Sequence, residues 1–133
     1  MTANIQSPQI KMLCMLAQDD ESALQYPLPD QIFGFLAQQS CEKLLKALLG
    51  SNGVAYPLTH QLGELYKLLA RCQETLPSLS YDPLQLVPFA VLLRYQYGPP
   101  LPESDRLAIR DSVAKLREHV VARILELERL SNP

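Results

Sequence analysis

The sequence contains only five glycines and two histidines, and both scarcities exclude whole classes of site. The glycines form no phosphate-binding loop of the usual kinds, and no serine lies in a nucleophile elbow. The histidines are far apart, without an HExxH motif or paired cysteines, so the sequence indicates neither a metal site nor a cofactor. The longest apolar run is far shorter than the roughly 20 residues that a membrane-spanning helix needs.

The charge balance is close to neutral, with a formal net charge of −2. A general nucleic-acid coat protein would be strongly basic, so that class is disfavoured, although local basic patches remain compatible with this balance. The three cysteines show no short-range pairing and no signal peptide is evident, which predicts a cytoplasmic location. With 133 residues, 47% of them hydrophobic, the chain is expected to form one domain over residues 1–133.

Apolar residues recur at helical spacing along the chain, and no segment alternates as a strand would. The first predicted helix covers about 8–18, and Asp19-Asp20-Glu21 is expected to end or fray it, because carboxylates are unfavourable near a helix C-terminus. Further helices are expected at about 31–49, 60–75, 83–97 and 103–130. Short links between amphipathic helices favour antiparallel neighbours, so we predict an all-α fold, an up-and-down four-helix bundle with an additional short N-terminal helix.

Two local features refine these helices. Thr59 is a plausible N-cap for the third helix, and Asp82-Pro83 gives an N-cap followed by proline for the fourth. Pro88 lies inside the fourth helix, where it predicts a kink or a start delayed to that residue.

The up-and-down arrangement would gather several cationic side chains at one end of the bundle. Lys46 lies near the end of the second helix, His60 at the start of the third and Arg94 near the end of the fourth, with Lys43 about one turn deeper. The last helix would begin at the same end, near Arg106. Unpaired backbone N–H groups in the first turn of a helix also favour an anion. The candidate nucleotide- or anion-binding residues are therefore Lys43, Lys46, His60 and Arg94.

The same side chains have simpler interpretations. Glu42 and Lys46 are spaced i, i+4 and can form a pair worth a few tenths of a kcal/mol on a solvated helix face. His60 can serve as a capping or packing residue, and as a catalytic base it would need a partner that the spacing does not reveal. Arg94 can pair with Glu103 or Asp105 across the loop that follows it.

Three segments resemble, in order, the successive motifs of the HEPN domain (higher eukaryotes and prokaryotes nucleotide-binding). They are Gln38-Gln39-x-x-Glu42-Lys43-x-x-Lys46-Ala47-Leu48-Leu49, Tyr56-Pro57-x-Thr59-His60-x-Leu62 and Leu93-Arg94-Tyr95. The resemblance covers about 30–120 and implies a bundle of four or more helices, frequent homodimerisation and a cytoplasmic role. It also implies, for bacterial and archaeal members, a toxin–antitoxin-type module with a minimal nucleotidyltransferase.

Many HEPN toxins are metal-independent ribonucleases, whose motif is an arginine, a polar residue, and a histidine after four to six intervening residues. Neither His60 nor His119 follows an arginine at that spacing, since Arg110 is too far before His119 and Arg117 too close. The resemblance thus favours a non-catalytic nucleotide- or anion-binding or regulatory partner of a minimal nucleotidyltransferase, with no catalytic residue assigned. Two alternatives stay open: a divergent metal-independent ribonuclease using His60 with Arg94 or a lysine, and a helical interaction scaffold without a small ligand.

Overall fold

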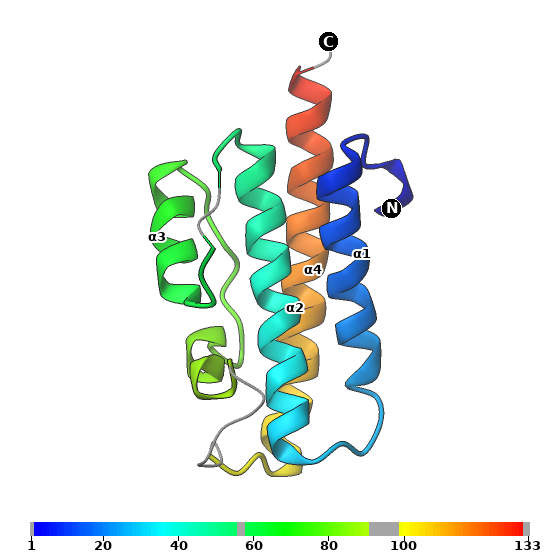
Figure 1. Ribbon diagram of the computed structural model, residues 1–133, viewed down its shortest axis with the longest axis vertical. Coiled ribbons are helices and arrows are strands. Elements are labelled where there is room, and N and C mark those ends of the chain that lie inside the picture. The colour runs from blue at the N-terminus through cyan, green and yellow to red at the C-terminus, as the bar shows by residue number, and fades with distance from the viewer. Residues whose placement is uncertain (1, 56–57, 91–98, 132–133) are drawn as a thin grey trace.

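The computed structural model describes residues 2–55, 58–90 and 99–131, and this part of the chain consists of helices and loops without a strand (Figure 1). Four α-helices cover Pro8–Ala23 (α1), Asp30–Ser51 (α2), Leu62–Arg71 (α3) and Glu103–Ser131 (α4), and two 3-10 helices cover Thr2–Asn4 (η1) and Pro83–Phe89 (η2). The predicted all-α bundle with an additional N-terminal helix is confirmed.

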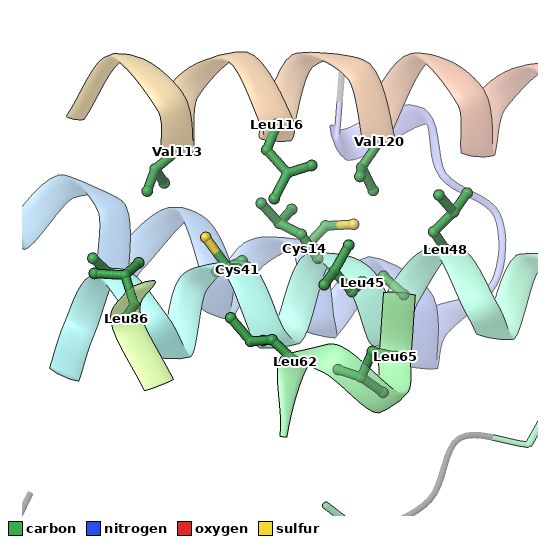
Figure 2. Packing of buried hydrophobic residues seen from close by; sticks show 14 of the residues in the cluster. Cys14, Cys41, Leu45, Leu48, Leu62, Leu65, Leu86, Val113, Leu116 and Val120 are labelled. Carbon is green, nitrogen blue, oxygen red and sulfur yellow. The ribbon is translucent and has the colours of Figure 1, made fainter. Parts of the chain in front are cut away.

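The core of the bundle surrounds α2, which packs against α1, α3, α4 and η2. Because α2 has neighbours on several sides, residues are buried around most of its circumference, including the polar Gln38, Ser40 and Glu42. Figure 2 shows how apolar side chains from α4 and α3 approach α2 from different sides: Val113, Leu116 and Val120 from α4, and Leu62 and Leu65 from α3.

The long helices do not all alternate in direction. α1 is antiparallel to α4, because the backbone N–H of Ser7, just before α1, donates to Glu128 near the end of α4 at 3.2 Å. α2 and α4 instead begin together, since Arg106 Nη2 donates to Asp30 Oδ1 at 2.7 Å. The prediction that Arg106 lies at the same end as Lys46 is therefore wrong. Lys46 lies roughly 24 Å further along α2 than Asp30, at a rise of about 1.5 Å per residue.

Near the C-terminal ends of α2, α3 and α4, one carboxylate links the three helices through hydrogen bonds. Glu74 follows α3, and its nearly buried side chain accepts hydrogen bonds from Arg123 Nε of α4 at 2.9 Å and from Asn52 Nδ2, just after α2, at 3.3 Å. The loop after α2 therefore returns along the bundle before α3 begins, so that α2, α3 and α4 run in the same direction (Figure 1).

α1 continues past the acidic run that was expected to end it, and stops at Ala23. The reason is long-range pairing: Asp20 forms an ion pair with Lys43 of α2, and Glu21 pairs with Arg117 Nε of α4 at 2.7 Å. These cations offset the unfavourable position of two carboxylates near a helix C-terminus.

α3 is shorter at both ends than the predicted range 60–75. Its N-cap residue is Gln61 rather than Thr59, whose Oγ1 accepts a hydrogen bond from the Gln61 N–H at 3.1 Å. The helix ends at Arg71, and Gln73 then adopts a left-handed conformation with φ of 63°. A residue with that φ cannot continue a right-handed helix.

The segment predicted as the fourth helix begins as a 3-10 helix. Asp82 is the N-cap, as expected, and its Oδ1 accepts from the Leu84 N–H at 2.9 Å. Pro88 lies inside this element, where its missing N–H is incompatible with a regular α-helix. Residues 91–97 of the predicted helix lie outside the described residues.

Candidate functional site

A buried polar cluster lies where the middle of α2 meets the start of α3. Gln38, Glu42 and Lys46 are spaced by four residues, so they form one stripe along α2. The Glu42 carboxylate accepts from Lys46 Nζ at 3.0 Å and from Gln38 Nε2 at 3.2 Å, and its side chain is only 5% exposed. His60 Nδ1 lies 3.1 Å from the same carboxylate. A buried carboxylate is tolerated when its oxygens are hydrogen-bonded in this way.

His60 is held at two points. Its backbone carbonyl accepts from Gln38 Nε2 at 3.1 Å, and its ring contacts Glu42 through Nδ1. An ionised carboxylate can only accept, so Nδ1 carries the proton and donates it. The imidazole is 67% exposed, which leaves Nε2 as the ring nitrogen available to a ligand. Glu42 therefore fixes both the orientation and the tautomer of the His60 ring.

The cluster can perform two kinds of chemistry. Lys46 Nζ and His60 Nε2 can donate hydrogen bonds to a phosphate, although the Glu42 charge offsets one of the two cations. In its neutral form, His60 can instead accept a proton at Nε2 while Nδ1–H remains bonded to the carboxylate. Both possibilities depend on Glu42, because its carboxylate contacts Lys46 and His60 and keeps the two side chains near one another.

The four predicted site residues do not all meet here. The structure brings Lys46 and His60 together at one carboxylate. Lys43 lies on a different face of α2 and pairs with Asp20 of α1. Arg94 lies outside the described residues.

The sequence reasoning missed the role of Glu42 as the partner of His60. The Glu42–Lys46 pair was expected on a solvated face and is confirmed as a pair, but it is largely buried. The available signal was the repetition of polar residues at Gln38, Glu42 and Lys46 along a helix that is otherwise rich in apolar residues. The contact between positions 42 and 60 depends on the return of the chain after α2, which no local pattern encodes.

The described residues contain neither a cluster of metal ligands nor a membrane-spanning helix. No group of three or more His, Cys, Asp or Glu side chains in this part of the chain could hold a metal ion. None of its helices is long and apolar enough to cross a lipid bilayer.

Comparison with known proteins gives one match. The family model of the HEPN domain matches residues 31–126, which include all but the first residue of α2, all of α3 and η2, and most of α4. No curated protein and no solved structure matches the chain. The matched range contains Gln38, Glu42, Lys46 and His60, whereas α1 lies outside it.

Proposed function

Because this chain belongs to the HEPN family, and a HEPN domain suggests a nucleotide-binding or RNase-like function, we propose that it binds a phosphate-bearing ligand through His60 and Lys46. The ligand would be a nucleotide or an RNA phosphate. The observation that supports the proposal is the shared contact of both side chains with Glu42, which holds two hydrogen-bond donors near one another. The exposed Nε2 edge of His60 provides access from solvent.

The start of α3 supports the same proposal. The N-cap residue, Gln61, makes no side-chain capping bond, and within the first turn the Glu64 N–H donates to the Gln61 carbonyl at 3.1 Å. α3 begins two residues after His60, and its positive dipole end would add to the attraction of Lys46.

We further propose that this binding serves a regulatory, non-catalytic role in a toxin–antitoxin-type module, beside a minimal nucleotidyltransferase. The absence of the Arg–polar–His spacing of HEPN ribonucleases supports the non-catalytic role. HEPN domains commonly dimerise, and Met12, Met15 and Leu16 expose an apolar stripe on α1 that could pack against a second copy. Met15→Glu should then convert a dimer to a monomer in light scattering, and a protein that is already monomeric would contradict this part of the proposal.

Calorimetric titration with ATP and with a short single-stranded RNA tests the binding site. Replacing His60 by Ala should weaken binding about 10- to 100-fold, the size expected for a lost hydrogen bond to a charged group. Lys46→Met, which keeps the apolar stem, should have a similar effect. Arg129→Ala is the matched control, because Arg129 is an exposed cation in the last turn of α4.

Unchanged affinity in the His60 and Lys46 variants would contradict the proposed site. If neither ATP nor RNA binds or raises the melting temperature, the interaction scaffold without a small ligand becomes the better interpretation, since a ligand of the folded state must raise it.

The Glu42–His60 contact favours one alternative, a metal-independent ribonuclease. The neutral His60 ring would accept the proton of the 2′-hydroxyl at Nε2 as the 2′-oxygen bonds to phosphorus, and Lys46 would stabilise the phosphate charge. The P–O5′ bond would break, and the 5′-oxygen would leave with a proton returned from the His60 imidazolium or taken from water. Cleavage of RNA in EDTA, lost in His60→Ala and reduced about 10²- to 10⁴-fold in Glu42→Gln, would support this alternative. Absence of cleavage by pure wild-type protein would exclude it.

A further inference from the structure

A cavity lies where the loop after α3 meets the start of η2. Its volume is about 300 Å³, at the lower limit of the roughly 300–1,000 Å³ that is typical of small-molecule sites. It therefore fits one or two amino-acid side chains better than a larger ligand. The lining comes from α3, the loop and η2, and consists of Tyr66, Pro77, Ser78, Leu79, Asp82, Pro83 and Leu84.

Contacts with α4 hold the loop wall of this cavity in place. Lys115 Nζ donates to the Ser78 carbonyl at 2.9 Å, and the Tyr81 N–H donates to Ser112 Oγ at 3.0 Å. Both bonds join the loop to a helix that is itself packed against α2. The wall is therefore ordered before a ligand arrives, which reduces the entropic cost of binding.

The cavity carries a negative charge that the fold does not neutralise. Asp82 is exposed and forms no ion pair with any residue in 2–55, 58–90 and 99–131. Its Oδ1 accepts from the Leu84 N–H at 2.9 Å, which leaves Oδ2 for a ligand. Burial raises the pKa of Tyr66 and the charge of Asp82 raises it further, so the phenol lies near this carboxylate and stays protonated. The electrostatics of the cavity therefore favour a cation.

The surface beside the cavity is apolar. Leu84 and Val87 are 42% and 41% exposed, and their spacing of three residues puts them on the same side of the 3-10 helix η2. Leu84 also lines the cavity, so the apolar surface is continuous with it. A ligand that covers both parts needs a cationic group with apolar groups next to it. A peptide segment carries both, whereas a small amine has no second group to place on Val87.

We propose that this surface binds a segment of a partner protein in which an arginine or lysine is flanked by apolar residues. The cationic group enters the cavity and pairs with Asp82, with the aromatic ring of Tyr66 adding a cation–π attraction. A flanking apolar side chain covers Leu84 and Val87. The site is separate from the Glu42 cluster, and its ligand has the opposite charge to the one proposed there.

Titration of the full chain, followed by amide chemical shifts, tests the proposal with three probes. These are the capped peptides Leu-Arg-Leu and Leu-Gln-Leu, and butylguanidinium as the isolated cationic group. The arginine peptide should shift the Leu79 and Leu84 signals and bind at least about tenfold more tightly than the glutamine peptide, because only arginine forms a charge-assisted hydrogen bond with the carboxylate. Butylguanidinium should bind more weakly than the arginine peptide, because it leaves Leu84 and Val87 uncovered.

Two variants and a matched control locate the binding. Asp82→Asn removes the charge but keeps a good N-cap residue for η2, so affinity for the arginine peptide should fall about tenfold or more at a nearly unchanged melting temperature. Val87→Ser should weaken the arginine peptide and leave butylguanidinium unaffected. Asp19→Asn is the control, because Asp19 is an exposed carboxylate on α1, and it should leave both affinities unchanged.

Equal binding of the arginine and glutamine peptides, or unshifted Leu79 and Leu84 signals, would overturn the proposal. An equal loss of affinity in Asp82→Asn and Asp19→Asn would also overturn it, because the attraction would then be to the net charge of the protein. Butylguanidinium that binds as tightly as the arginine peptide would overturn the peptide assignment in favour of a small organic cation. None of these results bears on phosphate binding by His60, which the ATP and RNA titrations measure separately.

Discussion

Gly34 of α2 gives a sharp test of the packing described above, because two physical effects predict opposite results for Gly34→Ala. Glycine inside a helix costs about 1 kcal/mol relative to alanine, so propensity alone predicts stabilisation. In the structure, however, a Cβ at position 34 would lie 2.7 Å or less from three ring carbons of Phe89. Phe89 is completely buried, so its ring has no route of escape into solvent.

Overpacking of a filled core typically costs about 1–3 kcal/mol, which outweighs the propensity gain. We expect Gly34→Ala to lower the free energy of unfolding by about 1–2 kcal/mol and the melting temperature by roughly 4–8 °C. Gly50 provides the matched control on the same helix, since a Cβ there would meet Ile10 Cγ1 at 3.4 Å, an ordinary contact distance. Gly50→Ala should therefore leave stability unchanged or raise it by up to about 1 kcal/mol.

Urea unfolding of the two single variants and of both in a Phe89→Ala background measures the coupling between Gly34 and the ring. Phe89→Ala should itself cost about 3–5 kcal/mol, and Gly34→Ala should become neutral or stabilising once the ring is absent. A Gly34→Ala protein that is more stable than the wild type would refute the reasoning, and so would additivity of the Gly34 and Phe89 substitutions.

Two further predictions concern thiols and carboxylates. Burial raises the pKa of Cys14 to about 11 and that of Cys41 to about 12. A disulfide reagent at neutral pH should therefore label only Cys72 in the native protein and all three thiols in urea. Fast labelling of a second thiol in the native protein would contradict the packing. The hydrogen bond from Arg106 lowers the pKa of Asp30 below its ordinary value, so the pair stabilises the fold above about pH 4 and this contribution is lost as the pH falls through the lowered value. Asp30→Asn should reduce the acid dependence of stability measured by thermal unfolding, and an unchanged pH profile would contradict this assignment.

Local sequence patterns correctly predicted the structural features that depend only on residues close to one another in the sequence. The apolar periodicity of α2 gave bounds of about 31–49, close to the observed Asp30–Ser51, and Asp82 was identified as an N-cap from its own position before a proline. The acidic run at the end of α1 was misjudged, since its pairing with Lys43 and Arg117 arises from other helices.

In the candidate site, likewise, the contact within one helix was predicted from the sequence and the contact between two elements was not. The Glu42–Lys46 pair lies within one helix and was predicted from its spacing. The direction of α3, and with it the contact between His60 and Glu42, depends on how the loop after α2 returns along the bundle. Helix periodicity specifies which face is apolar but not in which direction the helix runs, so this contact required the structure.

The two anchoring carboxylates have a consequence for the motions of α3. A helix of ten residues is unstable by itself in water, yet α3 is fastened before its first turn by His60 to Glu42 and after its last turn by Glu74 to Arg123. Such a segment should open and close as a single unit rather than fray from one end. The amide protons of α3 would then share one free energy of protection against exchange with solvent, from its first turn to its last.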